Sequence, residues 1–115
     1  MTHTNNHIDY VEFVAADLGA VKAFYEKAFG WEFEIWGEEY ISFKSAGLEG
    51  GFHRAEKPSP AGALIILYAD DLEASEKNVV EAGGEITERH EFPGGRRFHF
   101  RDPAGNILGV WTITN

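Results

Sequence analysis

Hydrophobic positions along the chain change their period several times, and each change predicts the boundary of an element. Residues 7–14 alternate between apolar and polar side chains and are rich in β-branched and aromatic types, which predicts a strand. From Leu18 to Phe29 the apolar residues recur at helical spacing, with Asp17 as the expected N-cap and Gly30 as the expected end. Three further short strands are predicted at residues 31–36, 40–45 and 48–53.

The second half of the chain repeats this order after a Pro-rich linker at residues 57–62. When the halves are offset by 54 residues, Asp17 falls on Asp71 and Gly30 on Gly84. A repeat of this kind predicts two similar modules, because one module alone cannot cover its own sheet. The predicted elements are a strand at 63–69, a helix from Leu72 that ends at Gly83-Gly84, and strands at 85–90, 96–101 and 107–113.

Together these elements predict an α+β fold in a single domain over residues 1–115. Two tandem βαβββ modules, at residues 7–56 and 63–113, are expected to pair into a curved mixed-sheet cup with the helices outside. The alternative is an unrelated α+β sandwich whose halves look alike by chance.

The charge and composition exclude several classes of function. The chain has 10 Lys and Arg against 19 Asp and Glu, which gives a net charge of −9 and disfavours nucleic acid and anionic membranes as partners. No cysteine is present, which excludes disulfides, thiolate nucleophiles and Cys-ligated metals. No apolar run is long enough to span a membrane and the first residues lack a signal-peptide core, so a soluble cytoplasmic protein is expected.

Several of these segments resemble the vicinal oxygen chelate superfamily, which includes glyoxalase I, bleomycin-resistance proteins and extradiol dioxygenases. The matching segments are Asp17-Leu18, residues 24–31, Asp70-Asp71-Leu72 and residues 102–108, and the resemblance runs from about His7 to Thr112. It implies a cup built from paired βαβββ modules. In the enzymes of the superfamily, His and Glu side chains on four strands hold a divalent metal at the base of that cup.

The resemblance also implies which positions here would carry the metal ligands. They are Tyr10, Gly51, Leu64 and Gly109, with an uncertainty of a residue or two at Gly51. None of them offers an imidazole or a carboxylate, and a divalent ion needs three or four converging donors. We therefore expect no cofactor. A metal at a displaced site held by Glu12 and His53, with His99 as a further candidate ligand, stays open as the alternative.

Strand parity predicts what faces the cup instead. Tyr10, Tyr68 and Trp111 are expected to line it, while Gly51, Leu64 and Gly109 stand at the former ligand positions and the two glycines make room for a ligand. The opposite strand faces hold apolar residues that suit packing against helices, namely Val11, Phe13, Ile65, Leu67, Leu108 and Val110. The alternative is that the aromatic rings only fill the space between two sheets.

Glu12 and His53 are the candidate catalytic residues. A carboxylate in an apolar cup has a raised pKa and can act as a base, and a nearby histidine can relay its proton. The alternatives are that Glu12 pairs with a cation or reaches solvent, and that His53 lies on the surface at a strand end.

Two features of residues 96–101 lead to further expectations. Phe98 and Phe100 are expected to be buried, which turns His99 to the other face of the strand. Arg96 and Arg97 are interpreted as solvated charges, with a gate that grips a carboxylate or phosphate as the alternative.

The predicted function is that of a metal-free binder of a small, partly aromatic molecule. The alternative is a glyoxalase-related lyase or isomerase that uses Glu12 as base. A third hypothesis is a small oligomerising module without a ligand. A homodimer is expected in each case, because the fold leaves a sheet edge and aromatic surface to cover.

Overall fold

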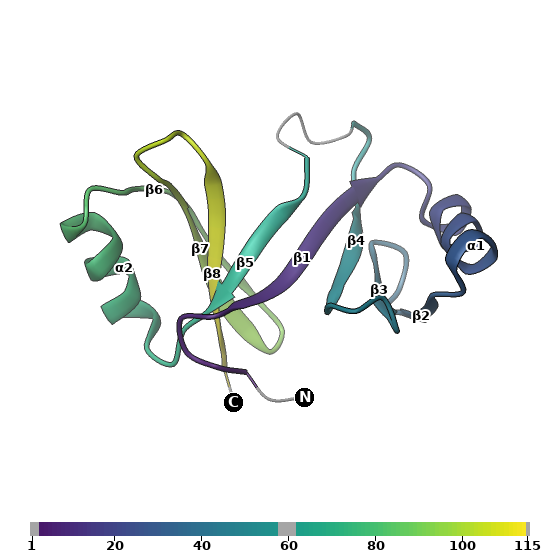
Figure 1. The fold of residues 1–115 in the computed structure, drawn as a ribbon, viewed down its shortest axis with the longest axis horizontal. Coiled ribbons are helices and arrows are strands. Elements are labelled where there is room, and N and C mark those ends of the chain that lie inside the picture. The colour runs from purple at the N-terminus through teal and green to yellow at the C-terminus, as the bar shows by residue number, and fades with distance from the viewer. Residues whose placement is uncertain (1–2, 58–61, 115) are drawn as a thin grey trace. The chain divides into compact units, whose positions relative to one another are not determined.

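The computed structural model describes residues 3–57 and 62–114 and divides the chain into two compact units. The first unit is residues 10–64, and the second unit is residues 3–9 with 65–114. Ten elements follow one another along the chain (Figure 1). They are β1 (Ile8–Ala15), α1 (Leu18–Phe29), β2 (Glu32–Ile35), β3 (Tyr40–Lys44), β4 (Gly50–Arg54), β5 (Leu64–Tyr68), α2 (Leu72–Glu81), β6 (Glu85–Phe92), β7 (Gly95–Arg101) and β8 (Ile107–Ile113).

The first unit is a four-stranded mixed sheet with α1 on one face. Its strands lie in the order β2-β3-β4-β1, with β1 and β4 parallel and the other neighbours antiparallel. The buried side chains Leu18, Ile41, Phe43 and Phe52 form the core, and Phe13 and Tyr25 pack against them. Alternation along the strands therefore directs the phenylalanines toward the helix, as the sequence predicts for Phe13.

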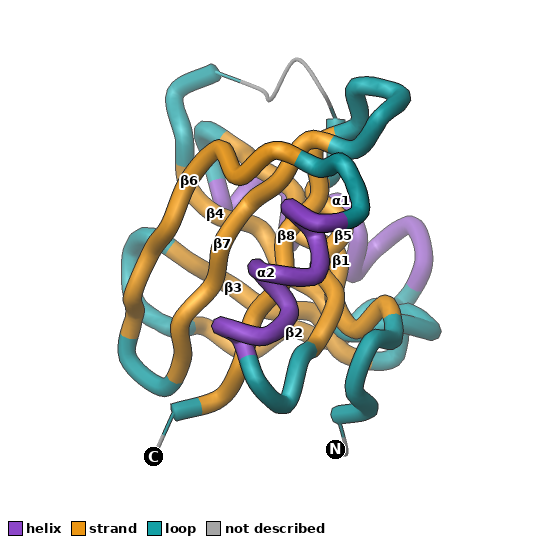
Figure 2. Tube along the Cα trace, turned by 90° about the vertical axis from the view of Figure 1, so that its left-hand side faces the viewer, coloured by secondary structure: helices purple, strands orange, loops and turns teal. Residues whose placement is uncertain are grey.

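The second unit repeats this arrangement with the strand order β5-β8-β7-β6. Strands β5 and β8 are parallel, and the β8-β7 and β7-β6 pairs are antiparallel. Helix α2 contacts β6, β7 and β8, and Figure 2 shows it lying against these strands. Its core consists of Ala69, Leu72, Phe98 and Val110, all buried.

Both helices begin and end as their sequences predict. The carboxylate of Asp17 accepts a hydrogen bond from the Ala20 backbone N–H at 3.0 Å, and Asp71 accepts one from Ala74 at the same distance. An N-cap of this kind satisfies one of the backbone donors that a helix leaves open at its start. Gly30 ends α1 in the left-handed conformation, with φ at 72°.

The order of elements and the α+β class are confirmed, with two βαβββ modules. Strand β6 runs to Phe92, two residues beyond the predicted end, because the hairpin closes through a two-residue loop and Phe92 pairs with Gly95. Of the predicted linker at 57–62, residues 58–61 lie outside the described residues. No helix in the described ranges is both long and apolar enough to cross a membrane.

Candidate functional site

The residues predicted to be catalytic lie on the face of the first sheet that points away from α1. In the register of the unit, Glu12 pairs with Gly51 and Gly51 with Ser42. Paired residues of neighbouring strands share a face, so these three positions lie in one row. Glu12 is half-buried and His53, one row further, is exposed. The structure therefore places Glu12 and His53 on the same face, as predicted from strand parity.

Tyr40 covers the position of Gly51 on this face, and Tyr10 of β1 contacts Tyr40. Their hydroxyl groups form a hydrogen bond. A Cβ added at Gly51 would lie 2.2 Å from the Tyr40 hydroxyl oxygen and 2.5 Å from the Ile41 carbonyl oxygen. The space that Gly51 leaves is thus occupied by the ring of Tyr40. Sequence reasoning missed Tyr40, although its place opposite the end of β4 follows from the β3-β4 hairpin.

The matching face of the second sheet carries three aromatic rings in contact. His3 lies parallel to Tyr68, with ring centroids 4.7 Å apart and an interplanar angle of 17°. Trp111 meets both rings edge-on, at 5.0 Å from His3 and 5.2 Å from Tyr68. Such separations and angles are favourable for aromatic pairs. We call His3, Tyr68 and Trp111 the ring cluster; it brings together two of the predicted ligand-binding residues and one that was not predicted.

A single carboxylate anchors the polar edge of the ring cluster. Asp9 accepts a hydrogen bond from the Trp111 indole N–H at 2.9 Å, and its other oxygen lies 2.9 Å from Nδ1 of His3. The side chain of Asp9 is only 11% exposed. An aspartate that is held in this way orients both rings around Tyr68.

Gly109 in the second sheet has a neighbour on each side but is less crowded than Gly51. It pairs with Ile66 on one side and with His99 on the other. A Cβ at Gly109 would lie 3.4 Å from Cδ2 of His99 and 3.4 Å from the Ile66 side chain, which is a tight but tolerable contact. Leu64, at the start of β5, is half-buried.

The residues at the four positions implied by the resemblance do not fit a divalent metal ion. Two of these positions are glycines with aromatic rings next to them, and one is a leucine. At the fourth, the Tyr10 hydroxyl is hydrogen-bonded to the Tyr40 hydroxyl. A metal site needs several oxygen, nitrogen or sulfur ligands that converge on one point. We therefore derive no chemistry through a metal at these positions.

A different group of metal-ligating side chains comes together on β6 and β7. Glu88, His90 and His99 each offer a ligand atom, and these atoms lie within 4.8 Å of one another. The pKa of Glu88 lies below its usual value, chiefly because the His90 imidazole donates a hydrogen bond to it. Burial lowers the pKa of His99, and the charge of Arg97 lowers it further.

Sequence reasoning singled out His99 but missed Glu88 and His90. The pairing of Glu88 with His99 follows from the two-residue loop Pro93-Gly94. This loop sets Phe92 opposite Gly95, and four residues further from the loop on each strand Glu88 lies opposite His99. The two-residue length of this turn was therefore the sequence feature that could have predicted the pairing. Phe98 is 1% exposed and packs toward α2, so the prediction that His99 faces the other way is confirmed.

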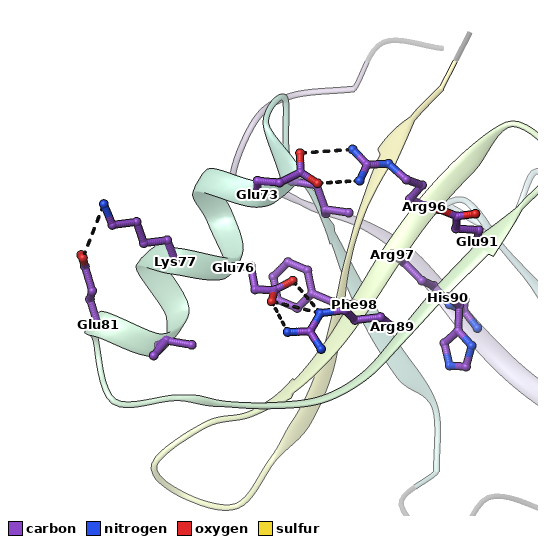
Figure 3. A pocket seen from close by; sticks show the side chains of 12 residues that line it. Glu73, Glu76, Lys77, Glu81, Arg89, His90, Glu91, Arg96, Arg97 and Phe98 are labelled. Atoms are coloured by element: carbon purple, nitrogen blue, oxygen red, sulfur yellow. Dashed lines mark hydrogen bonds and ion pairs between the residues drawn. The ribbon is translucent and has the colours of Figure 1, made fainter.

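The helix side of the same hairpin carries a groove of about 630 Å³ whose charged groups pair with one another. Figure 3 shows Glu73 of α2 reaching Arg96 of β7, and Glu76 reaching Arg89 of β6. The Arg96 guanidinium holds the pKa of Glu73 below its usual range. Arg96 thus ties α2 to β7, as expected for an ordinary surface charge, and Arg97 lies on the opposite face of the strand.

Comparisons with known proteins agree with this architecture. The model of the Glyoxalase/Bleomycin resistance protein/Dioxygenase superfamily matches residues 7–110. No curated protein matches the sequence.

Among solved structures, the Mn(II)-bound glyoxalase from Novosphingobium aromaticivorans is 27% identical, with a TM-score of 0.68, over 94% of this chain and 39% of that one. A methylmalonyl-CoA epimerase is 15% identical, with a TM-score of 0.74, over 99% and 100% of the two chains. A structure described as NAD-dependent benzaldehyde dehydrogenase from Legionella pneumophila is 15% identical, with a TM-score of 0.72, over 91% and 98%. At 15% identity the last two show the fold alone.

Proposed function

Because this chain belongs to the glyoxalase/bleomycin resistance protein/dioxygenase superfamily, we propose that it binds a small, partly aromatic molecule without a metal at the positions of Tyr10, Gly51, Leu64 and Gly109. The observation that carries the proposal is the ring cluster of the second unit. There the ring of Tyr68 already accepts a planar five-membered ring, the imidazole of His3, at stacking distance. A free ligand with a planar ring can take the same place.

The polar edge of the ring cluster indicates the chemistry of that ligand. Asp9 faces Nδ1 of His3 and the indole N–H of Trp111, so it accepts hydrogen bonds from the groups around it. A ligand that replaces His3 satisfies Asp9 best when it carries an N–H donor or a positive charge beside its ring. We therefore propose a planar, nitrogen-containing aromatic molecule as the ligand class.

The remaining predicted residues are proposed to line the ligand-binding faces of the two units. In the first unit these are Tyr10 and Gly51, and in the second unit Gly109, which lies between Ile66 and His99. Leu64 is proposed as an apolar contact at the start of β5. Apolar walls with a few polar anchors are typical of small-molecule sites.

Binding of histamine and benzamidine is tested by titration while recording the fluorescence of the protein's tryptophans, and binding of indole by its displacement of histamine in NMR. Histamine and benzamidine should quench or shift the emission saturably, and indole, which has no positive charge, should bind more weakly. Trp111→Phe should abolish the response. Trp36→Phe is the matched control, since Trp36 lies in the first unit and is 60% exposed. An unchanged response in Trp111→Phe, or equal binding by Asp9→Asn, contradicts the proposed site.

The second candidate is a lyase or isomerase that uses Glu12 as the base. The observation in its favour is that Glu12 is half-buried on the sheet face away from α1, in the row of Gly51. His53, on the same face, would relay the proton. Glu12→Gln should abolish turnover of any substrate found while leaving ligand binding at the ring cluster intact. Full turnover by this variant refutes the assignment.

We also propose that the protein forms a homodimer through the first unit. Five large apolar side chains of this unit are more than half exposed: Phe24, Phe29, Ile35, Trp36 and Leu48. Apolar side chains of this size are often covered by a partner. Sedimentation velocity should show twice the chain mass, and replacement of Phe29, on α1, by Asp should return the monomer.

A further inference from the structure

We propose that Glu88, His90 and His99 bind a divalent transition-metal ion, with Zn²⁺ as the reference ion. The site lies on β6 and β7 of the second unit and uses none of the strand positions that the superfamily resemblance implies. It is independent of the ring cluster and of the function proposed for it.

The hairpin brings the three side chains together through its register. Glu88 lies directly opposite His99, and His90 follows two residues later on the same strand, so all three project from the same face. A bulge between Ile86 and Glu88 shifts the pairing of β6 with β7, and from Glu88 onward the strand pairs as described. Bulges of this kind re-aim side chains next to functional sites.

The three ligand atoms lie within 4.8 Å of one another, near the spacing that a small metal ion needs. Nε2 of His90 lies 2.9 Å from one oxygen of Glu88, and Nδ1 of His99 lies 3.5 Å from the other. Ligands about 2.1 Å from a tetrahedral zinc ion are about 3.4 Å from one another. Small rotations of exposed Glu88 and His90 are sufficient to close around an ion.

His99 is the buried member of the three candidate ligands. His99 is 7% exposed, and within the described part of the chain its Nε2 atom has no hydrogen-bond partner. The other ring nitrogen, Nδ1, is the one that faces Glu88, at 3.5 Å from its carboxylate, and it is the atom available to an ion.

The ligand types select the ion. Two imidazoles and one carboxylate suit Zn²⁺, Ni²⁺, Co²⁺ and Cu²⁺, whereas Ca²⁺ and Mg²⁺ prefer sites made of oxygen atoms. Arg97 lies opposite His90, and its positive charge opposes the ion. Removal of this charge should therefore strengthen binding.

Isothermal titration of chelator-treated, tag-free protein with ZnCl₂ tests the site, with MgCl₂ as the comparison ion. One Zn²⁺ per chain should bind and Mg²⁺ should not. His90→Gln and Glu88→Gln, both at exposed positions that should not affect folding, should each weaken binding by at least about tenfold. His7→Gln, another exposed histidine of the same unit, is the matched control, and Arg97→Gln should bind more tightly.

NMR of the imidazole nitrogens gives a second readout, since the signals of His90 and His99 should shift on Zn²⁺ addition while that of His7 stays in place. Absence of saturable binding overturns the proposal, as does equal Zn²⁺ affinity of the His90→Gln, Glu88→Gln and His7→Gln variants. His90→Gln and Glu88→Gln change no residue of the ring cluster, whereas Arg97→Gln, which lies opposite Trp111, is used in the Zn²⁺ titration alone. Loss of the metal site therefore leaves the fluorescence response to histamine in place, and the two proposals fail separately.

Discussion

Gly51→Ala should destabilise the protein, because two neighbours occupy the space that its methyl group needs. The added Cβ would lie 2.2 Å from the Tyr40 hydroxyl oxygen and 2.5 Å from the Ile41 carbonyl oxygen. Tyr40 can turn away at the cost of its hydrogen bond to Tyr10. The Ile41 carbonyl cannot, because it belongs to the β3 backbone beside β4.

The size of the effect follows from this overpacking, which costs about 1–3 kcal/mol in well-packed proteins. At about 2.1 cal/mol/K per residue, a chain of 115 residues loses about 4 °C in Tm for each kcal/mol. We therefore expect Gly51→Ala to melt about 4–12 °C below the wild type in differential scanning calorimetry.

Gly109→Ala is the matched control. Its Cβ would meet the nearest atoms, on His99 and Ile66, at 3.4 Å, which small side-chain shifts relieve. Alanine also suits the interior of a strand better than glycine by about 0.5–1 kcal/mol. The stability of Gly109→Ala should therefore equal or slightly exceed that of the wild type. If Gly51→Ala and Gly109→Ala melt at the same temperature, Tyr40 does not fill the position as described.

Three further predictions concern single contacts. Phe98→Ala, at a side chain that is 1% exposed, should cost about 3–5 kcal/mol in guanidinium unfolding, and a loss below 1 kcal/mol would mean that the second core lies elsewhere. In a double-mutant cycle of Tyr10→Phe and Tyr40→Phe, the coupling free energy should be about 0.5–1.5 kcal/mol, whereas additive effects would exclude the hydroxyl–hydroxyl bond. Hydrogen bonds from Asn106 lower the pKa of Asp102, so NMR titration should give a pKa below 3.8. The stability that the Asp102 carboxylate contributes should be lost as pH falls through that lowered pKa. Asp102→Asn should not show this loss of stability.

Helix boundaries and strand faces were predictable because local chemistry decides them. Asp17 and Asp71 are short acceptors placed just before an apolar period, and both cap their helices as expected. Phe98 and His99 were assigned to opposite faces from alternation alone, which a strand enforces. Strand ends were less predictable, because the end of β6 depends on the loop that follows it rather than on its own residues.

The candidate sites were predictable only in part, because they depend on contacts between distant residues. Tyr68 and Trp111 were expected on one face, but nothing local indicates that His3 stacks on Tyr68. The ring of Tyr40 over Gly51 depends in the same way on the register of β3 against β4. Glu88 and His99 are the intermediate case, since a two-residue turn fixes their pairing once the turn is recognised.

The central claim, that the face of Tyr68 accepts a free planar ligand, is tested most directly by chemical rescue. His3→Ala removes the imidazole that stacks on Tyr68 and leaves its place beside Asp9 open. Added imidazole should then shift the Trp111 indole N–H signal saturably and raise the Tm of His3→Ala more than that of the wild type. If imidazole leaves the Trp111 signal of His3→Ala unchanged, the face does not bind a free ring and the account is contradicted.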